Sequence, residues 1–489
     1  ILPLVLQHHA LHQCMQMLLF LTVINLRHNF NKICLFLVII KIKRINSEVK
    51  MMYSMYNIIK LKESIESETF NFRCRKREKD FIRKRKITPK DLIYYTLNNR
   101  GKTTKMELYD FRQEYNIDEV STAALLKQRE KLNEEIFKEL NKESMQRFYG
   151  EFKEEVKTYK GYIIAAIDGS DCEVPNTPET RKIYKPVTSD NDQRVARIKL
   201  SNCYDVLNKY VLDTRVERYK EGEFFLAMKH IEYVNYINDL YPMIYVMDRG
   251  YFSLGYMFRL KKDGKKFIIR LTKSFLKIEQ KGMKSNDELV EIQYQTERIK
   301  SYKDKDEEFY NYYMEGNRMS LRFVNITLPT GEIETLMTNL TKDELSTEDI
   351  NEIYKLRWGI ETHYHELKES MMVTNVSSSK DTIIKQEIYA QMMVYNIIRS
   401  ITNEQEKGIN QEKYKHPMKV NFNMAVGFVK RFLIRIMIEE DEKKRQELSD
   451  KLFNNIIKNL IPIRNGRNSS RSKNKKYTNK HPINKRKSI

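Results

Sequence analysis

The middle of the chain alternates short, continuously apolar runs with longer amphipathic stretches between residues 160 and 272. The runs predict five strands, at Tyr162–Ile167, Arg197–Tyr204, Lys209–Glu217, Met243–Met247 and Lys266–Leu271. Helical periodicity predicts helices at Glu223–Tyr236 and Ser253–Lys262. Continuous apolar strands that alternate with helices indicate a sheet covered on both faces, so this region is predicted to be an α/β core.

A polar stretch rich in Lys, Glu and Tyr interrupts this pattern at residues 273–340. Two strands are predicted within it, at Leu321–Leu328 and Ile333–Asn339, and we interpret it as a β-rich insertion. The core is expected to resume over residues 341–460. Its first helix is predicted to begin after Ser346, which caps it with Asp349 three residues on, and further helices follow, one near Thr382–Thr402.

Residues 51–150 are predicted to form a small basic helical domain. Phe72–Lys86 carries nine basic residues and two acids, and Thr88-Pro89-Lys90-Asp91 reads as a capping box with Pro at the first helical position. Helical patterns follow at Asp91–Leu97, Lys105–Tyr115 and Ser121–Leu140. The basic run indicates either a DNA-binding surface or a solvated charged face, and both interpretations stay open.

The two ends of the chain differ from the rest. Residues 1–50 contain apolar runs at Met17–Ile24 and Ile33–Ile40, each far shorter than the ~20 residues needed to span a bilayer. We expect this segment to be translated upstream sequence, with the natural start near Met51; a membrane anchor is the alternative. The basic tail 461–489 has ten Lys or Arg and no acid from Arg464 onward, and it is predicted to stay disordered until it meets a polyanion.

Composition narrows the class of partner. The 489 residues suffice for two or three domains, and the net charge of +22 points to a polyanion, most commonly nucleic acid. None of the five cysteines lies at a Cys-x-x-Cys spacing, which argues against a disulfide framework or zinc ribbon and fits a reducing cytosol.

Candidate chemistry begins where two predicted strands end. Asp168 follows the first apolar run and Asp248 follows the fourth, and Gly169 and Gly250 come soon after them. Functional side chains gather at the carboxyl ends of strands in open α/β sheets, and a nearby glycine lets the backbone turn and leaves room for a ligand. An aspartate in this position is otherwise a turn residue or a helix cap. Asp171 is a second candidate near the first site.

The helix after Ser346 carries further polar residues on one side. At ~100° per residue, four of them share a stripe about 60° wide: Tyr354, Arg357, Glu361 and Lys368. The apolar residues cluster on another side, at Ile353, Leu356, Ile360, Leu367 and Met371. A solvated ion pair at i,i+4 explains Arg357 and Glu361 but leaves the other two unexplained. Trp358 lies beside the stripe; burial in the core is the favoured interpretation, and stacking on DNA is the alternative.

These residues resemble a known family. The spacing Tyr354-x2-Arg357-x3-Glu361-x6-Lys368 is similar to the signature of bacterial insertion-sequence transposases of the IS-four type, a class of DDE transposases. Ile167-Asp168-Gly169-Ser170 and Asp248-Arg249-Gly250-Tyr251 resemble that family's two acidic motifs, and the likeness extends over roughly residues 80–470. The resemblance implies an RNase H-like catalytic core with a β-rich insertion between the second aspartate and the glutamate.

The resemblance also implies a site and a reaction. Asp168, Asp248 and Glu361 would be the catalytic and metal-binding residues, holding two Mg²⁺ or Mn²⁺ ions that suit hard oxygen ligands. DNA would be contacted by the remaining candidates, Tyr354, Arg357, Lys368, Arg249 and Trp358. An aromatic residue of the insertion would fill the gap left by a flipped base, with Tyr310, Tyr312 and Tyr313 as candidates.

The expected partners are the terminal inverted repeats of the element and target DNA, bound by a homodimer in the bacterial cytoplasm in association with the nucleoid, without a membrane. Water would free a 3′-hydroxyl at the element's end, and that hydroxyl would attack target DNA. Two other functions stay open: an RNase H-fold nuclease that cuts without strand transfer, and a decayed transposase that only binds DNA.

Overall fold

The structure is a computed structural model that describes residues 52–184, 196–292, 296–328 and 331–463. The chain divides into two compact units, Ile1–Tyr56 and Asn57–Ile489, and the fold below is that of the second. The predicted upstream segment 1–50 and the tail from Arg464 onward lie outside the described residues. None of the helices in the described ranges is long and apolar enough to cross a membrane.

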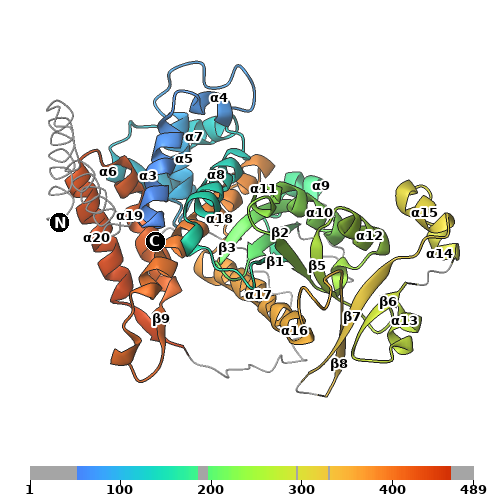
Figure 1. The fold of residues 1–489 in the computed structure, drawn as a ribbon. Helices are drawn as coiled ribbons and strands as arrows, with labels where there is room; N and C mark the ends of the chain where they lie inside the picture. Colours follow the sequence, from blue (N-terminus) through green and yellow to red (C-terminus); the bar gives the residue numbers. More distant parts are fainter. Residues whose placement is uncertain (1–51, 185–195, 293–295, 329–330, 464–489) are drawn as a thin grey trace, which may run out of the picture. The chain divides into compact units, whose positions relative to one another are not determined.

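One large mixed sheet organises the fold (Figure 1), with the strand order β3-β2-β1-β4-β5-β8-β7-β6. The strands are β1 (Ile163–Glu173), β2 (Arg197–Asp205), β3 (Tyr210–Arg218), β4 (Met243–Met247), β5 (Lys266–Arg270), β6 (Asp287–Glu291), β7 (Ser320–Thr327) and β8 (Ile333–Thr338). Strands β1, β2 and β3 are antiparallel neighbours, whereas β4 runs parallel to β1 and β5 runs parallel to β4. The strands expected from the apolar runs are therefore confirmed, and the chain is mixed α/β.

Helices pack against both faces of this sheet. Every residue of β4 is buried, as are the first five residues of β1. Because successive strand residues point to opposite faces, this continuous burial confirms the prediction of a sheet covered on both sides. The helices that contact strands β1 to β5 include α10 (Glu223–Tyr233), α12 (Leu254–Lys262) and α17 (Trp358–His365). Helices α8 (Ile136–Glu151) and α18 (Asp381–Lys407) contact the edge strand β3.

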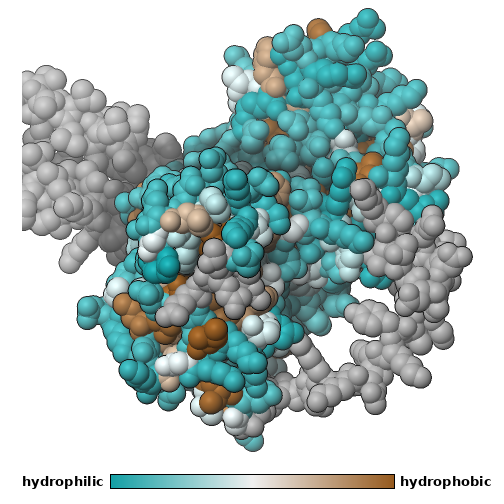
Figure 2. All heavy atoms as spheres, turned by 90° about the vertical axis from the view of Figure 1, so that its right-hand side faces the viewer, coloured by the Kyte–Doolittle hydropathy of each residue, from teal (hydrophilic) through white to brown (hydrophobic). Residues whose placement is uncertain are grey.

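The segment 273–340 does not form a separate β layer. Its strands β6, β7 and β8 continue the same sheet beyond β5, since β8 pairs antiparallel with β5. It also contains three helices, so the expectation of a mainly β segment was wrong: α13 (Lys277–Gly282), α14 (Thr296–Lys300) and α15 (Glu307–Met314). Figure 2 shows a largely hydrophilic face with small apolar groups. The exposed apolar side chains of this segment include Ile278 and Leu289.

A buried arginine fastens this segment to the chain that follows it. Arg322 of β7 is 3% exposed and forms an ion pair of 2.7 Å with Asp287 of β6. The same guanidinium donates hydrogen bonds to the carbonyls of Thr341 and Leu345, at 2.9 and 2.7 Å. A buried charge needs this degree of pairing to be tolerated.

The N-terminal helices include the two predicted near Asp91–Leu97 and Lys105–Tyr115, and two, at Tyr53–Glu66 and Phe70–Cys74, that were not predicted. Their bounds are α3 (Tyr53–Glu66), α4 (Phe70–Cys74), α5 (Pro89–Leu97), α6 (Thr104–Tyr115) and α7 (Thr122–Arg129). The capping box of Thr88 and Asp91 is present at the start of α5. The single helix expected over Ser121–Leu140 is wrong, because α7 and α8 are separate. The backbone between them bonds elsewhere: Lys76 N donates to Lys131 O at 2.9 Å.

The C-terminal helices complete the unit. Helix α19 (Phe422–Ile438) and helix α20 (Glu442–Ile457) pack together and against α18. Buried Arg129 of α7 pairs with Glu387 of α18 at 2.9 Å, which ties the N-terminal helices to this group. The remaining elements are α9 (Pro178–Tyr184), α11 (Asn235–Asn238), α16 (Thr347–Leu356), β9 (Met418–Val420) and β10 (Leu460–Pro462).

Candidate active site

Asp168 and Asp248 occupy matching positions on neighbouring strands. The parallel pairing of β1 with β4 ends at Ile167 and Met247, and the two aspartates come next on their chains. Neighbouring strands lie ~4.8 Å apart, so both carboxylates meet at the same edge of the sheet. One expectation is corrected: Asp168 does not end its strand, because β1 continues to Glu173 through its pairing with β2.

The strand alternation also separates Asp168 from Asp171. The pairing of β1 with β2 runs without a break from residue 165 to residue 173, so side chains three residues apart point to opposite faces. Asp171 is exposed and its strand partner is Lys199, whereas Asp168 is half-buried beside the end of β4. Asp168 is therefore the aspartate of this strand that shares a location with Asp248.

The electrostatics of the pair are those of crowded carboxylates. Burial raises the pKa of Asp168 to about 7, and the negative charge of Asp248 adds to the rise. The N–H of Gly169, which donates to the Asp168 carboxylate at 2.8 Å, and the charge of Arg357 oppose it. Two neighbouring carboxylates that resist joint ionisation fit a divalent cation, because its charge offsets the repulsion and its preferred ligands are oxygens.

The helix that carries Glu361 is bonded directly to the strand of Asp168. The hydroxyl of Tyr364 in α17 donates to the Asp168 carbonyl at 2.7 Å and lies 3.0 Å from the carbonyl of Leu200. Tyr364 is three residues after Glu361, on a neighbouring position of the helix surface. This hydrogen bond thus fixes the position of α17 relative to Asp168 on β1.

Glu361 itself is engaged by an arginine. Its Oε1 accepts a hydrogen bond from Arg357 Nη2 at 3.1 Å, and Arg357 also acts electrostatically on Asp168. Across the described ranges, no three Asp, Glu, His or Cys side chains are close enough to hold a metal ion together. The structure thus brings Asp168 and Asp248 together and places Glu361 on the helix bonded to β1, with Arg357 as its partner.

The expected single helix from Ser346 to Lys368 is interrupted, which corrects the regular spacing of the polar stripe. The capping box of Ser346 and Asp349 is present, but α16 ends at Leu356 and α17 begins at Trp358. A π-helical segment, Glu366–Ser370, then follows, and π segments are frequent at functional sites. Glu366 is held there by hydrogen bonds from Tyr395, at 2.9 Å, and from Arg399.

Lys368 lies in this π-helical segment and bonds to β1. Its Nζ donates to the Ser170 hydroxyl at 2.7 Å and to the Asp171 carbonyl at 3.0 Å. The lysine therefore fastens the end of the helix to the part of β1 beyond Asp168.

The other residues of the stripe have different surroundings. The hydroxyl of Tyr354 is buried without a hydrogen-bond partner among the described residues, and the guanidinium of Arg357 lies 5.6 Å from its ring centre. Trp358 is 55% exposed, so the favoured interpretation of a buried core tryptophan was wrong. Arg249 is also exposed, in the short turn of helix that follows Asp248.

The structure separates Tyr313 from the other two candidate tyrosines of the insertion, Tyr310 and Tyr312. Tyr313 is 6% exposed and packs edge-on against Phe309, which makes it a core residue of α15. Tyr312 donates to the Arg318 carbonyl at 2.8 Å, and both Tyr310 and Tyr312 are half-buried.

Two features near the aspartates were not expected from the sequence. Glu223, the first residue of α10, leans over Gly250: a Cβ at that glycine would lie 2.4 Å from Glu223 Oε2 and 3.1 Å from Asp248 Oδ1. Beneath the site, Ser201 lies 2.9 Å from His230 Nε2 and 3.3 Å from the Asp168 carbonyl. Both features depend on contacts between segments that are distant in the sequence. The one sign of them in the sequence was Glu223, an acidic residue at the start of a predicted helix.

A family model described as a transposase DDE domain matches residues 159–397, and the chain resembles insertion-sequence transposases of the IS4 type. The predicted family resemblance is thus confirmed.

Two relatives illustrate the similarity. The chain is 23% identical over 282 residues to the transposase InsG for insertion sequence element IS4 of Escherichia coli, covering 56% of this chain and 60% of that protein. It is 26% identical over 163 residues to a putative transposase for insertion sequence element IS4SA of Synechocystis, covering 33% of this chain and 42% of that protein. The matches thus span less than two thirds of either relative.

Among solved structures, a piggyBac transposase synaptic complex with hairpin DNA aligns with 86% of this chain and 85% of its own. The TM-score is 0.36 at 11% identity, too low for two folds to be counted as the same.

Proposed function

We propose that this protein is a DNA transposase that cuts phosphodiester bonds at the ends of an insertion sequence and joins the freed 3′-hydroxyl to target DNA. The single observation that carries the proposal is the adjacency of Asp168 and Asp248 at one sheet edge, with the helix of Glu361 bonded to the same strand through Tyr364. The similarity of residues 159–397 to a transposase DDE domain supports it.

The catalytic core is proposed to be RNase H-like. The strand order β3-β2-β1-β4-β5 supports this, with three antiparallel strands followed by two parallel ones. The proposed organisation is a DNA-binding helical domain at 51–150, a core divided between 160–272 and 341–460, and an insertion at 273–340. The basic segments at 72–86 and in the tail are proposed to supply phosphate contacts.

Asp168, Asp248 and Glu361 are proposed to hold two divalent cations, Mg²⁺ or Mn²⁺. Such cations, when bound, activate an attacking oxygen and offset negative charge at phosphorus. The chain's own contribution is to bury Asp168 beside Asp248, and both effects, burial first, raise the pKa of Asp168 and favour a bound cation. Arg357 is proposed to position Glu361 through the hydrogen bond that it donates to that carboxylate.

The proposed substrates are the element's terminal repeats and target DNA, with a homodimer acting on them. A net charge of +22 favours a polyanionic substrate. Arg249 and Trp358 are both exposed, and in the sequence Arg249 follows Asp248 while Trp358 lies three residues before Glu361. Both are therefore proposed to contact DNA. Tyr354 and Lys368 are proposed to contact DNA as well.

The decisive experiment incubates the full chain with DNA that carries the sequences flanking its gene, in Mg²⁺, and follows both cut and joined products. The variants Asp168→Asn, Asp248→Asn and Glu361→Gln should each abolish cleavage and retain DNA binding. Asp171→Asn is the matched control, because its side chain faces away from Asp248. Cleavage that survives any of the three changes would overturn the site, and cutting without joining would identify a nuclease instead.

A further inference from the structure

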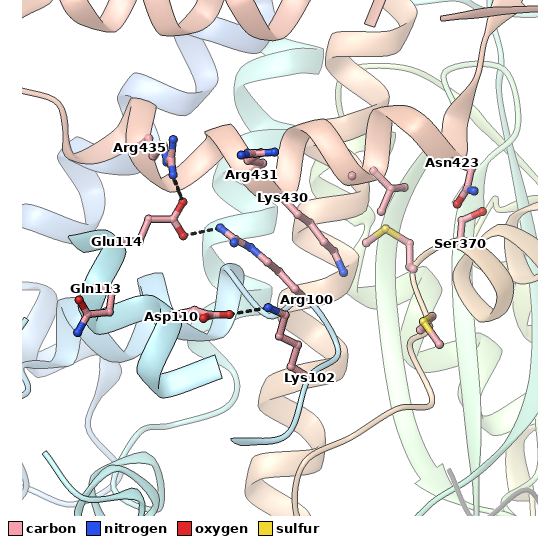
Figure 3. Close-up of a pocket in the computed structure, with 14 residues that line it drawn as sticks. Arg100, Lys102, Asp110, Gln113, Glu114, Ser370, Asn423, Lys430, Arg431 and Arg435 are labelled. Atoms are coloured by element: carbon pink, nitrogen blue, oxygen red, sulfur yellow. Dashed lines mark hydrogen bonds and ion pairs between the residues drawn. The ribbon is translucent and has the colours of Figure 1, made fainter. Parts of the chain in front are cut away.

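A basic pocket lies outside the candidate active site, between the loop that precedes α6 and the C-terminal helix α19 (Figure 3). Its volume is about 670 Å³. The cationic residues that line it are Arg100, Lys102, Lys430, Arg431 and Arg435. Only two acids, Asp110 and Glu114, lie among the lining residues. The pocket therefore carries a surplus of positive charge.

The carboxylates of Asp110 and Glu114 orient the cationic side chains, and the pocket still keeps a net positive charge. Glu114 accepts from Arg100 at 2.6 Å and from Arg435 at 2.7 Å, so one carboxylate holds two guanidinium groups (Figure 3). Asp110 likewise holds Lys102 at 2.7 Å. These pairs fix the direction of side chains that would otherwise be disordered, which lowers the entropic cost of binding an anion.

Donor capacity remains in the pocket. Arg100 Nε is buried and has no hydrogen-bond partner in the described part of the chain. Arg431 is exposed and forms no ion pair with any described residue. Guanidinium groups are suited to phosphate because their donors form a fixed fork.

The lining also identifies which part of a nucleic acid would fit. The apolar side chains that line it are Met371, Met372 and Val426, and its described lining contains no aromatic ring. Base recognition in single strands relies on aromatic stacking, so this pocket suits the sugar–phosphate backbone of a duplex. Phosphate contacts position a protein on DNA without selecting its sequence.

The pocket is continuous with the candidate active site along the chain. Ser370, the last residue of the π-helical segment that holds Lys368, lines the pocket together with Met371 and Met372. The segment that follows Glu361 therefore supplies residues to the pocket as well.

We propose that the pocket formed by Arg100, Lys102, Lys430, Arg431 and Arg435 binds backbone phosphates of the DNA duplex beyond the cleaved end. This inference rests on the proposed function, since it assigns a second contact to the same substrate. The pocket acts as a sequence-independent anchor.

The test measures equilibrium binding of a labelled duplex of random sequence to the full chain over a range of salt concentrations. The double variant Lys430→Ala/Arg431→Ala should lower affinity about tenfold at low salt and reduce the slope of log affinity against log salt by about 1 to 2, because each lost phosphate contact removes ~0.9. The conservative variant Lys430→Arg/Arg431→Lys should restore both. Lys443→Ala/Lys444→Ala on exposed α20 is the matched control and should leave the slope unchanged.

An unchanged slope in the pocket variant would overturn the proposal. Loss of saturable inorganic phosphate binding with unchanged DNA binding would also overturn it and assign the pocket to a small phosphorylated ligand. The readout contains no catalytic step, so it separates the two proposals. Suppose that the full chain neither cuts nor joins DNA, and that the pocket variant still has a smaller slope of log affinity against log salt. This result would refute the transposase function and support phosphate binding by the pocket.

Discussion

The hydroxyl of Tyr364 and the carbonyl of Asp168 are joined by a hydrogen bond of 2.7 Å, which links the helix of Glu361 to the strand of the first aspartate. The bond runs from a side chain to the backbone, so it sets the position of Asp168 without occupying its carboxylate. The position of Glu361 relative to Asp168 therefore depends on a residue that takes no part in the chemistry.

Replacing Tyr364 with Phe removes the hydroxyl that bonds to the carbonyls of Asp168 and Leu200 and keeps the aromatic ring. The folded chain should lose about 1 kcal/mol of stability, the usual contribution of one hydrogen bond, because the ring still fills its site. Cleavage should fall about tenfold or more, since small misplacements of catalytic groups are costly. Single-turnover cleavage should be measured beside DNA binding, with Tyr233→Phe in α10 as the control, since its hydroxyl also donates to a backbone carbonyl, that of Lys138. Equal rates in both variants would show that the bond does not position Asp168.

Gly250→Ala is expected to disturb the carboxylates rather than the fold. The new Cβ would lie 2.4 Å from Glu223 Oε2 and 3.1 Å from Asp248 Oδ1, so one or both must move. We expect a strong loss of cleavage with a melting temperature within a few degrees of the wild type, because the displaced atom of Glu223 is the end of a flexible side chain. Gly150→Ala is the control, since nothing lies within 4 Å of its added Cβ. Adding Glu223→Ala to Gly250→Ala should recover activity in part; no recovery would mean that Asp248 alone is disturbed.

Ionisation of Asp168, which is buried beside Asp248, is expected to destabilise the folded protein when no metal is bound. The pKa of Asp168 is raised to about 7, against roughly 3.9 in an unfolded chain, so ionisation costs the folded state increasingly as pH rises from about 4 to 7. In the presence of a chelator, Asp168→Asn should therefore be more stable than the wild type at pH 8, by up to a few kcal/mol, and gain little near pH 4. Thermal melts across this range test it, with exposed Asp343→Asn as the control. A gain that does not depend on pH would point to a cause other than ionisation.

Arg357 lowers the pKa of Asp168 and donates to Glu361, so its loss should affect both acids. Arg357→Ala is expected to raise the Mg²⁺ concentration needed for half-maximal cleavage several-fold. It should also move the acidic limb of the pH–rate profile to higher pH, because Asp168 loses a stabilising positive charge. If Arg357 instead only grips DNA, Mg²⁺ titrations will match the wild type and binding to end-containing DNA will weaken. Lys368→Ala, which releases a bond to Ser170, provides the comparison.

The strands and helix starts could be predicted because they depend on local patterns. Continuous apolar runs located β1 and β4, and the capping boxes at Thr88 and Ser346 marked the starts of α5 and α16. Adjacency of the two aspartates followed from the general geometry of parallel strands. Each of these signals lies within a few residues of sequence.

What could not be predicted depends on contacts between distant segments. The π-helical segment arises where Tyr395 and Arg399 hold Glu366, about 30 residues apart in sequence, and periodicity carries no trace of it. The extension of β1 past Asp168 follows from its pairing with β2. Trp358 is exposed although its residue type favours burial, and single-residue preference cannot decide such a case.

The continuation of the sheet into the insertion determines how such proteins can be recombined. Strand β8 supplies the ladder partner of β5, and Arg322 of β7 is satisfied by carbonyls that lie after the insertion, at Thr341 and Leu345. A chimera in which residues 273–340 of this chain were replaced would lose Arg322, leave the carbonyls of Thr341 and Leu345 without their donor, and give β5 a foreign neighbour. An open β5 edge would invite pairing with other chains. In this chain the insertion therefore cannot be exchanged independently of β5 and of the segment that carries Thr341 and Leu345.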